Sequence, residues 1–156
     1  MDQVEQTTAP ATAAPKSIYV VGVLALLWNA LGCYDYLMTR LRDTDYLAAM
    51  MPTVDPNAML AWVDAFPIWA QFGWGLGVWG GLLGAILLMM RNRWAVPVFA
   101  ASLVGAVLGL GYQIFMAPPL AGAESAINDI MPYVIILVAL ALFLFARAMR
   151  AKGVLR

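Results

Sequence analysis

The sequence contains no histidine, a single cysteine and few charged side chains, which make up 12% of its 156 residues. Without histidine the chain has no imidazole for a zinc site, a His-ligated haem, a Ser-His-Asp triad or a proton switch near neutral pH. One cysteine excludes an intrachain disulfide. Nine basic and nine acidic side chains give a formal net charge of zero, whereas nucleic-acid binding requires a basic surface. We therefore expect no nucleic-acid partner, no metal and no other cofactor.

Hydrophobic residues are abundant, at 63% of the chain. A soluble domain has about 45–50%, so this chain has too little polar surface to face water on all sides. A helix needs about 20 mostly apolar residues to cross a bilayer, and four stretches meet this requirement: 18–38, 67–90, 94–116 and 131–149. The sequence therefore predicts an all-α integral membrane protein built as a four-helix bundle.

Prolines and polar segments mark the ends of the predicted spans. Pro67 and Pro132 fit the first turn of the second and fourth helices, where a missing N–H is harmless. The other segments are expected to be a disordered cytoplasmic N-terminus (1–17), two outer loops (39–66 and 117–130) and a basic cytoplasmic tail (150–156).

Lysine and arginine are distributed unevenly between the two ends of the predicted bundle. Only Arg40 and Arg42 fall in the outer loops. The positive-inside rule therefore predicts that both termini lie in the cytoplasm. The basic residues on that side are Lys16, Arg91, Arg93, Arg147, Arg150, Lys152 and Arg156.

A competing interpretation concerns residues 30–33, Ala-Leu-Gly-Cys, which weakly resemble a lipoprotein cleavage box with Cys33 as the lipidated residue. The box usually has Leu where this chain has Ala30, and only Lys16 precedes the apolar run as a basic residue. We prefer the interpretation of Cys33 as a small buried residue of the bundle.

A short amphipathic helix is predicted in the first outer loop. Asp55 followed by Pro56 is typical of a helix N-cap and first helical position. Such a helix could lie on the outer leaflet or cover the mouth of the bundle. Its apolar residues at helical spacing are Met59, Leu60, Trp62, Val63 and Phe66.

Glycines recur at every fourth position in the two central spans. Helix association in a bilayer depends on close packing, and small residues at this spacing let two backbones approach. The pattern predicts a tight hairpin of the second and third helices, or a homodimer through one glycine face, or both. The helix-packing residues are Gly73, Gly77 and Gly81, with Gly80 and Gly84 as a second pair, and Gly105 and Gly109 on the third helix.

Polar and aromatic side chains inside the spans are the candidates for ligand binding. A polar group in a membrane span is unfavourable unless it is partnered or hydrated, and amides flanked by aromatic rings suit a neutral polar ligand. The alternative is an interfacial aromatic belt with interhelical hydrogen bonds worth about 0.6 kcal/mol each. The candidates are Trp28, Asn29, Asp35, Tyr36, Gln71, Trp74, Tyr112 and Gln113.

Several segments carry a resemblance to a known family. They are residues 25–32, the 67–70 start of the second helix, residues 80–84, the 91–97 connection and the closing Ala-Lys-Gly at 151–153. The chain resembles a small bacterial family of uncharacterised four-helix inner-membrane proteins, some of them labelled sugar transporters. The family has no agreed catalytic or binding residues, so the resemblance implies the fold and no residue roles.

Three functions compete. The first is a membrane protein without enzymatic activity, an accessory or envelope factor that binds lipid or a partner membrane protein, alone or as a homo-oligomer or part of a larger complex. The second is an oligomeric transporter of small neutral polar solutes such as sugars, which would require a dimer because four helices rarely enclose a hydrated path. A membrane enzyme is disfavoured, because Asp35 alone would carry the acid-base chemistry.

Overall fold

The computed structural model describes residues 15–156 and contains six α-helices in that range. Four are long and apolar enough to cross a membrane: α1 (Lys16–Arg40), α4 (Ile68–Met89), α5 (Ala95–Phe115) and α6 (Ala126–Ala151). The other two, α2 (Thr44–Met50) and α3 (Pro56–Asp64), are short. The predicted all-α four-helix fold is confirmed, and the chain is a membrane protein. The predicted N-terminal segment lies outside the described residues except for its last three, two of which already belong to α1.

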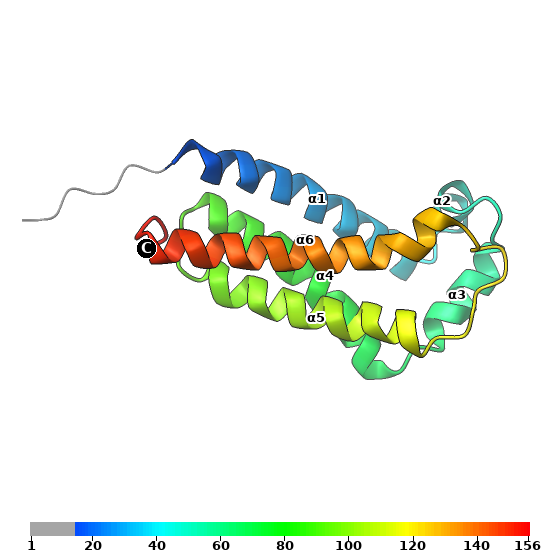
Figure 1. Ribbon diagram of the computed structural model, residues 1–156. Helices are drawn as coiled ribbons and strands as arrows, with labels where there is room; N and C mark the ends of the chain where they lie inside the picture. Colours follow the sequence, from blue (N-terminus) through cyan, green and yellow to red (C-terminus); the bar gives the residue numbers. More distant parts are fainter. Residues whose placement is uncertain (1–14) are drawn as a thin grey trace, which may run out of the picture.

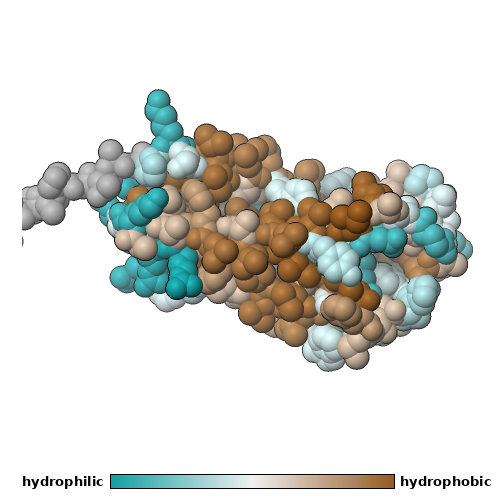
Figure 2. Space-filling view, viewed as in Figure 1, coloured by the Kyte–Doolittle hydropathy of each residue, from teal (hydrophilic) through white to brown (hydrophobic). Residues whose placement is uncertain are grey.

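The long helices form an antiparallel bundle (Figure 1), in which α1 packs on α4, α4 on α5 and α5 on α6. Both ends of the described chain lie at one end of the bundle, here called the terminal end. Helices α2 and α3 lie at the opposite end, here called the loop end. Figure 2 shows a band of hydrophobic side chains across the middle of the bundle with hydrophilic side chains at both ends, as expected for a protein that crosses a bilayer.

Glycines bring α4 and α5 into backbone contact. A Cβ atom on Gly77 would lie 2.9 Å from the backbone nitrogen of Ala106, and one on Gly109 would lie 2.9 Å from that of Trp74. These distances are too short for any side chain, so the predicted hairpin is confirmed. The second glycine pair also packs within the chain: Gly80 faces Ser102 and Gly84 faces Phe99.

The fourth span begins earlier than predicted. Ser125 caps α6, and its hydroxyl accepts a hydrogen bond from the backbone N–H of Asn128 (3.3 Å). Pro132 therefore lies inside the helix, and its predicted place in the first turn is wrong. The start of α6 is polar and has the hydropathy of a loop, so the prediction began the helix too late. A proline inside a helix leaves the carbonyl four residues earlier without its N–H partner, and the first turns of α6 are angled to the rest (Figure 1). Pro67 is the residue immediately before α4.

The last residues fold back onto the α4–α5 turn. Arg156 donates its backbone N–H to the Arg91 carbonyl and accepts one from Arg93, both at 2.8 Å. Val154 and Leu155 are buried as a result. They complete a hydrophobic core at the terminal end, which also contains Ile18, Ala25, Ala85, Leu88, Ala95, Phe99, Leu142, Ala146 and Met149.

Candidate functional site

A cavity of about 510 Å³ lies between α1 and α6, with α4 and α5 behind it. It exists because α1 and α6, both described over their full lengths, pack little against each other. Toward the terminal end it closes at Phe99 and Leu142, which also belong to the hydrophobic core. Its wall is largely apolar and includes Leu31, Leu110, Ile135 and Val138. We call this cavity the α1–α6 cleft.

Helix α2 covers the cleft at the loop end. Its Tyr46 and Met50 line the cleft. Asp43 fixes the start of this helix, because its carboxylate accepts the backbone N–H of Tyr46 at 2.9 Å. Helix α2 was not predicted, although Asp43 is a residue type that favours N-caps. A helix of seven residues is too short to show a clear apolar period.

Asp35 and two tyrosines form the polar end of the cleft. The Tyr46 hydroxyl donates a hydrogen bond to Oδ1 of Asp35 at 3.1 Å. The rings of Tyr34 and Tyr46 meet edge to face, with centroids 5.4 Å apart. Burial, together with the neighbouring Asp35 carboxylate, raises the pKa of Tyr46 to about 12, so its phenol keeps the proton that it donates to Asp35 over the physiological range.

Asn29 and Ser102 place two further polar groups in the middle of the cleft. Both groups are fixed by the backbone: Asn29 donates its Nδ2–H to the Ala25 carbonyl at 2.7 Å, and Ser102 donates its hydroxyl to the Gly77 carbonyl at 2.6 Å. The Asn29 side-chain oxygen faces Gly81, so this predicted packing glycine accommodates α1 rather than only α5. These partners stabilise the polar groups within a span, where an unpaired one would be unfavourable.

The structure separates the eight predicted ligand residues into two groups. Four of them line the α1–α6 cleft: Trp28, Asn29, Asp35 and Trp74. The other four, Tyr36, Gln71, Tyr112 and Gln113, do not line it. Tyr46 and Ser102 do line it and were missed; Ser102 faces the glycine-rich α4, a contact that only a three-dimensional arrangement reveals.

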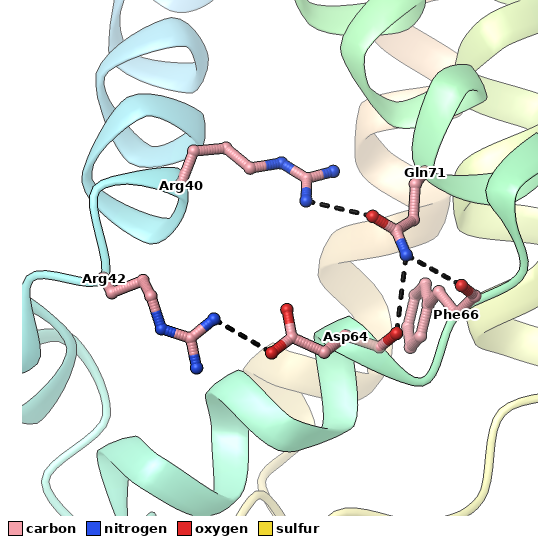
Figure 3. A network of polar contacts seen from close by, with 5 residues as sticks. All are labelled: Arg40, Arg42, Asp64, Phe66 and Gln71. Atoms are coloured by element: carbon pink, nitrogen blue, oxygen red, sulfur yellow. Dashed lines mark hydrogen bonds and ion pairs between the residues drawn. The ribbon is translucent and has the colours of Figure 1, made fainter.

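Tyr36 and Gln71 hold Arg40 instead. The Arg40 guanidinium lies 5.3 Å from the centre of the Tyr36 ring and 5.2 Å from that of Trp74, at a separation typical of cation–π contacts. One of its nitrogens donates to Oε1 of Gln71 at 3.0 Å (Figure 3). Gln71 in turn donates its Nε2–H to the Phe66 carbonyl at 2.8 Å.

Figure 3 shows that this network joins the end of α1 to α3 and to the start of α4. Next to it, Arg42 forms an ion pair of 2.9 Å with Asp64 at the end of α3. Both side chains of that pair are more than half exposed, at 57% and 52%. We interpret the network as a structural connection between α1 and α4.

Tyr112 of α5 packs against the connection between α3 and α4 and the first turn of α4. Its ring packs against Phe66 and Trp69, with centroids 4.8 Å and 5.5 Å apart. The indole N–H of Trp62 donates to the Pro118 carbonyl at 2.7 Å. The predicted helix in the first outer loop is confirmed as α3, with Asp55 as its N-cap, and its apolar residues Leu60 and Val63 are buried.

Comparison with models of protein families, with curated proteins and with solved structures finds no match to this chain. The resemblance to a family of bacterial inner-membrane proteins therefore stays a prediction.

Proposed function

We propose that this protein is a non-enzymatic membrane protein that binds one lipid molecule in the α1–α6 cleft. The observation that carries the proposal is the cleft itself, a cavity of about 510 Å³ between two helices of the bundle. Small-molecule sites are typically about 300–1,000 Å³ in volume, mostly apolar, with a few polar groups. The α1–α6 cleft has this size and this composition.

The distribution of polar groups favours an amphiphile over a small polar solute. The apolar wall, including Leu31, Ile135 and Val138, suits an acyl chain, whereas Asp35 and Tyr46 lie together near the loop end. A sugar would need many hydrogen-bond partners around it, because each buried polar group without a partner is unfavourable by about 1–3 kcal/mol. A lipid needs them only at its head group.

The closed end of the cleft supports a binding protein over a transporter. Beyond Phe99 and Leu142 the bundle is filled by its hydrophobic core as far as Val154 and Leu155. A transported solute would have to pass through this core or between two copies of the chain. We therefore favour an accessory factor of the bacterial inner membrane, with the arginine-rich terminal end in the cytoplasm, that holds a lipid.

Filling the cleft tests the proposal. Ala139 lines the cleft on α6, whereas Ala141 on the same helix is exposed and does not line it. Ala139→Phe is therefore expected to displace the lipid, and Ala141→Phe is the matched control. The measurement is native mass spectrometry of the detergent-solubilised proteins, which counts the phospholipids retained by each chain.

We expect the wild type and Ala141→Phe to retain one more lipid per chain than Ala139→Phe. Equal retention by all three proteins would overturn the proposal. A change in oligomeric state in Ala139→Phe with unchanged lipid retention would also contradict it, because a helix of a second chain would then occupy the cleft. Uptake of labelled sugar by vesicles that contain the protein, blocked by Ala139→Phe, would instead support the transporter.

A further inference from the structure

We propose that the polar end of the cleft binds the protonated amine of a phosphatidylethanolamine head group, with Asp35 as its counter-ion. This inference rests on the proposed function, since it names the class of lipid that the α1–α6 cleft takes. It depends on three observations: the hydrogen bonds that Asp35 leaves unused, the partners of the two neighbouring arginines, and the aromatic rings around the carboxylate.

Only one of the two carboxylate oxygens of Asp35 accepts a side-chain hydrogen bond within residues 15–156. Tyr46 donates to Oδ1 at 3.1 Å, and no other side-chain hydrogen bond to this carboxylate exists within residues 15–156. Asp35 forms no ion pair with any of these residues either, although it lines the cleft. A carboxylate within a membrane-spanning helix is unfavourable unless it is paired, so a cationic group is the partner that this position lacks.

The two arginines at the loop end are engaged elsewhere. Arg40 points between α1 and α4, where it contacts the Tyr36 and Trp74 rings and donates to Gln71. Arg42 pairs with Asp64. The described chain thus directs both cations away from Asp35, and the charge that complements this carboxylate has to come from the ligand.

Depth and surroundings fit a phospholipid amine. Asp35 precedes the end of α1 at Arg40 by five residues, or about 7.5 Å at 1.5 Å per residue. That depth is near the boundary between head groups and hydrocarbon. The rings of Tyr34 and Tyr46 beside Asp35 offer faces on which an ammonium group is stabilised. An anionic head group has no ammonium to balance its phosphate, so the same carboxylate repels it.

Head-group competition on the unmodified protein tests the inference without any variant. The lipid retained in the cleft is exchanged against phosphatidylethanolamine, phosphatidylglycerol and phosphatidylcholine with identical chains, and retention is counted by native mass spectrometry. We expect the ethanolamine lipid to bind at least about tenfold more tightly than the glycerol lipid, since hydrogen bonds to charged groups are strong. The choline lipid should fall between them, because its methylated ammonium cannot donate a hydrogen bond.

Asp35→Asn should bring the affinities for the three lipids to within about twofold of each other, because the amide carries no charge. Asp45→Asn is the control, since Asp45 is exposed on α2 and does not line the cleft; it should keep the wild-type preference. Equal affinities in the wild type, with binding still blocked by Ala139→Phe, would overturn this inference and leave the proposed function intact. Loss of the Ala139→Phe effect would overturn both.

Discussion

The side-chain oxygen of Asn29 in α1 occupies the space that a Cβ atom on Gly81 of α4 would fill. The Asn29 amide is held in this orientation by its hydrogen bond to the Ala25 carbonyl, 2.7 Å long. A glycine at position 81 therefore lets α1 approach α4 at a polar residue. The same helix uses Gly73 and Gly77 to contact the α5 backbone, so α4 packs against two partners through glycines.

Replacing this glycine should separate α1 from α4. In Gly81→Ala the added methyl group collides with Asn29, and we expect a destabilisation of about 1–3 kcal/mol, as for other overpacked interiors. The double variant Asn29→Ala/Gly81→Ala should recover much of the loss. The measurement is unfolding in mixed micelles, with Gly32→Ala as control, because no atom lies within 4 Å of a Cβ at that position. A Gly81→Ala protein as stable as Gly32→Ala would contradict the close contact.

The α4–α5 contact predicts that two glycines of α5 respond differently to substitution by alanine. Gly105→Ala should destabilise the bundle by about 1–3 kcal/mol or more, because the methyl group meets backbone atoms of Gly73 and Gly77 that have no room to move. Gly111→Ala should be neutral or slightly stabilising, since a Cβ there meets nothing within 4 Å and alanine favours a helix. Thermal melting of the two variants in detergent compares them, and equal melting temperatures would contradict the packing.

The arginine network predicts unequal effects of two neighbouring substitutions. Gln71→Ala removes the side-chain acceptor of Arg40, and we expect a loss of about 1.5–3 kcal/mol, the range for hydrogen bonds to charged groups. Arg42→Ala breaks only an exposed ion pair, which should change stability by less than about 1 kcal/mol. Unfolding in mixed micelles distinguishes the two. An Arg42→Ala loss as large as that of Gln71→Ala would contradict our interpretation.

The spans and the hairpin could be predicted from the sequence because they follow from hydropathy and from glycine spacing. Asp55 followed by Pro56 marked the start of α3, and the short connection of residues 90–94 is consistent with α4 and α5 as antiparallel neighbours. The start of α6 could not be placed by hydropathy, since Asn128 and Asp129 lie within the helix. A cap at Ser125 was the available signal.

The candidate site could be predicted only in part, because helix rotation decides which polar side chains meet. Asn29 and Asp35 lie on faces of α1 that both border the cleft, whereas Gln71 on α4 turns toward Arg40. Gln71 lies outside the cleft because it binds Arg40, a residue that was considered in the sequence only as one of the loop charges. Tyr46 reaches Asp35 through α2, a helix too short to be seen in the pattern.

The hydrogen bond between Tyr46 and Asp35 predicts a distinctive titration. The pKa of Tyr46 is raised from 10.0 to about 12, first by burial and then by the Asp35 carboxylate. The folded protein thus holds this phenol proton more tightly than the unfolded chain does. The stabilisation is complete below about pH 10 and is lost as the pH rises through about 12.

Tyrosinate absorbance measures this titration, with the Tyr46→Phe spectrum subtracted to remove the other five of the six tyrosines. Asp35→Asn should lower the pKa of Tyr46 only part of the way toward 10.0, because burial, the larger cause, remains. Asp45→Asn should leave the titration unchanged, since its carboxylate makes no contribution to the shift. A Tyr46 pKa near 10.0 in the wild type would mean that α2 does not cover the cleft. The polar end of the lipid site would then be open to solvent.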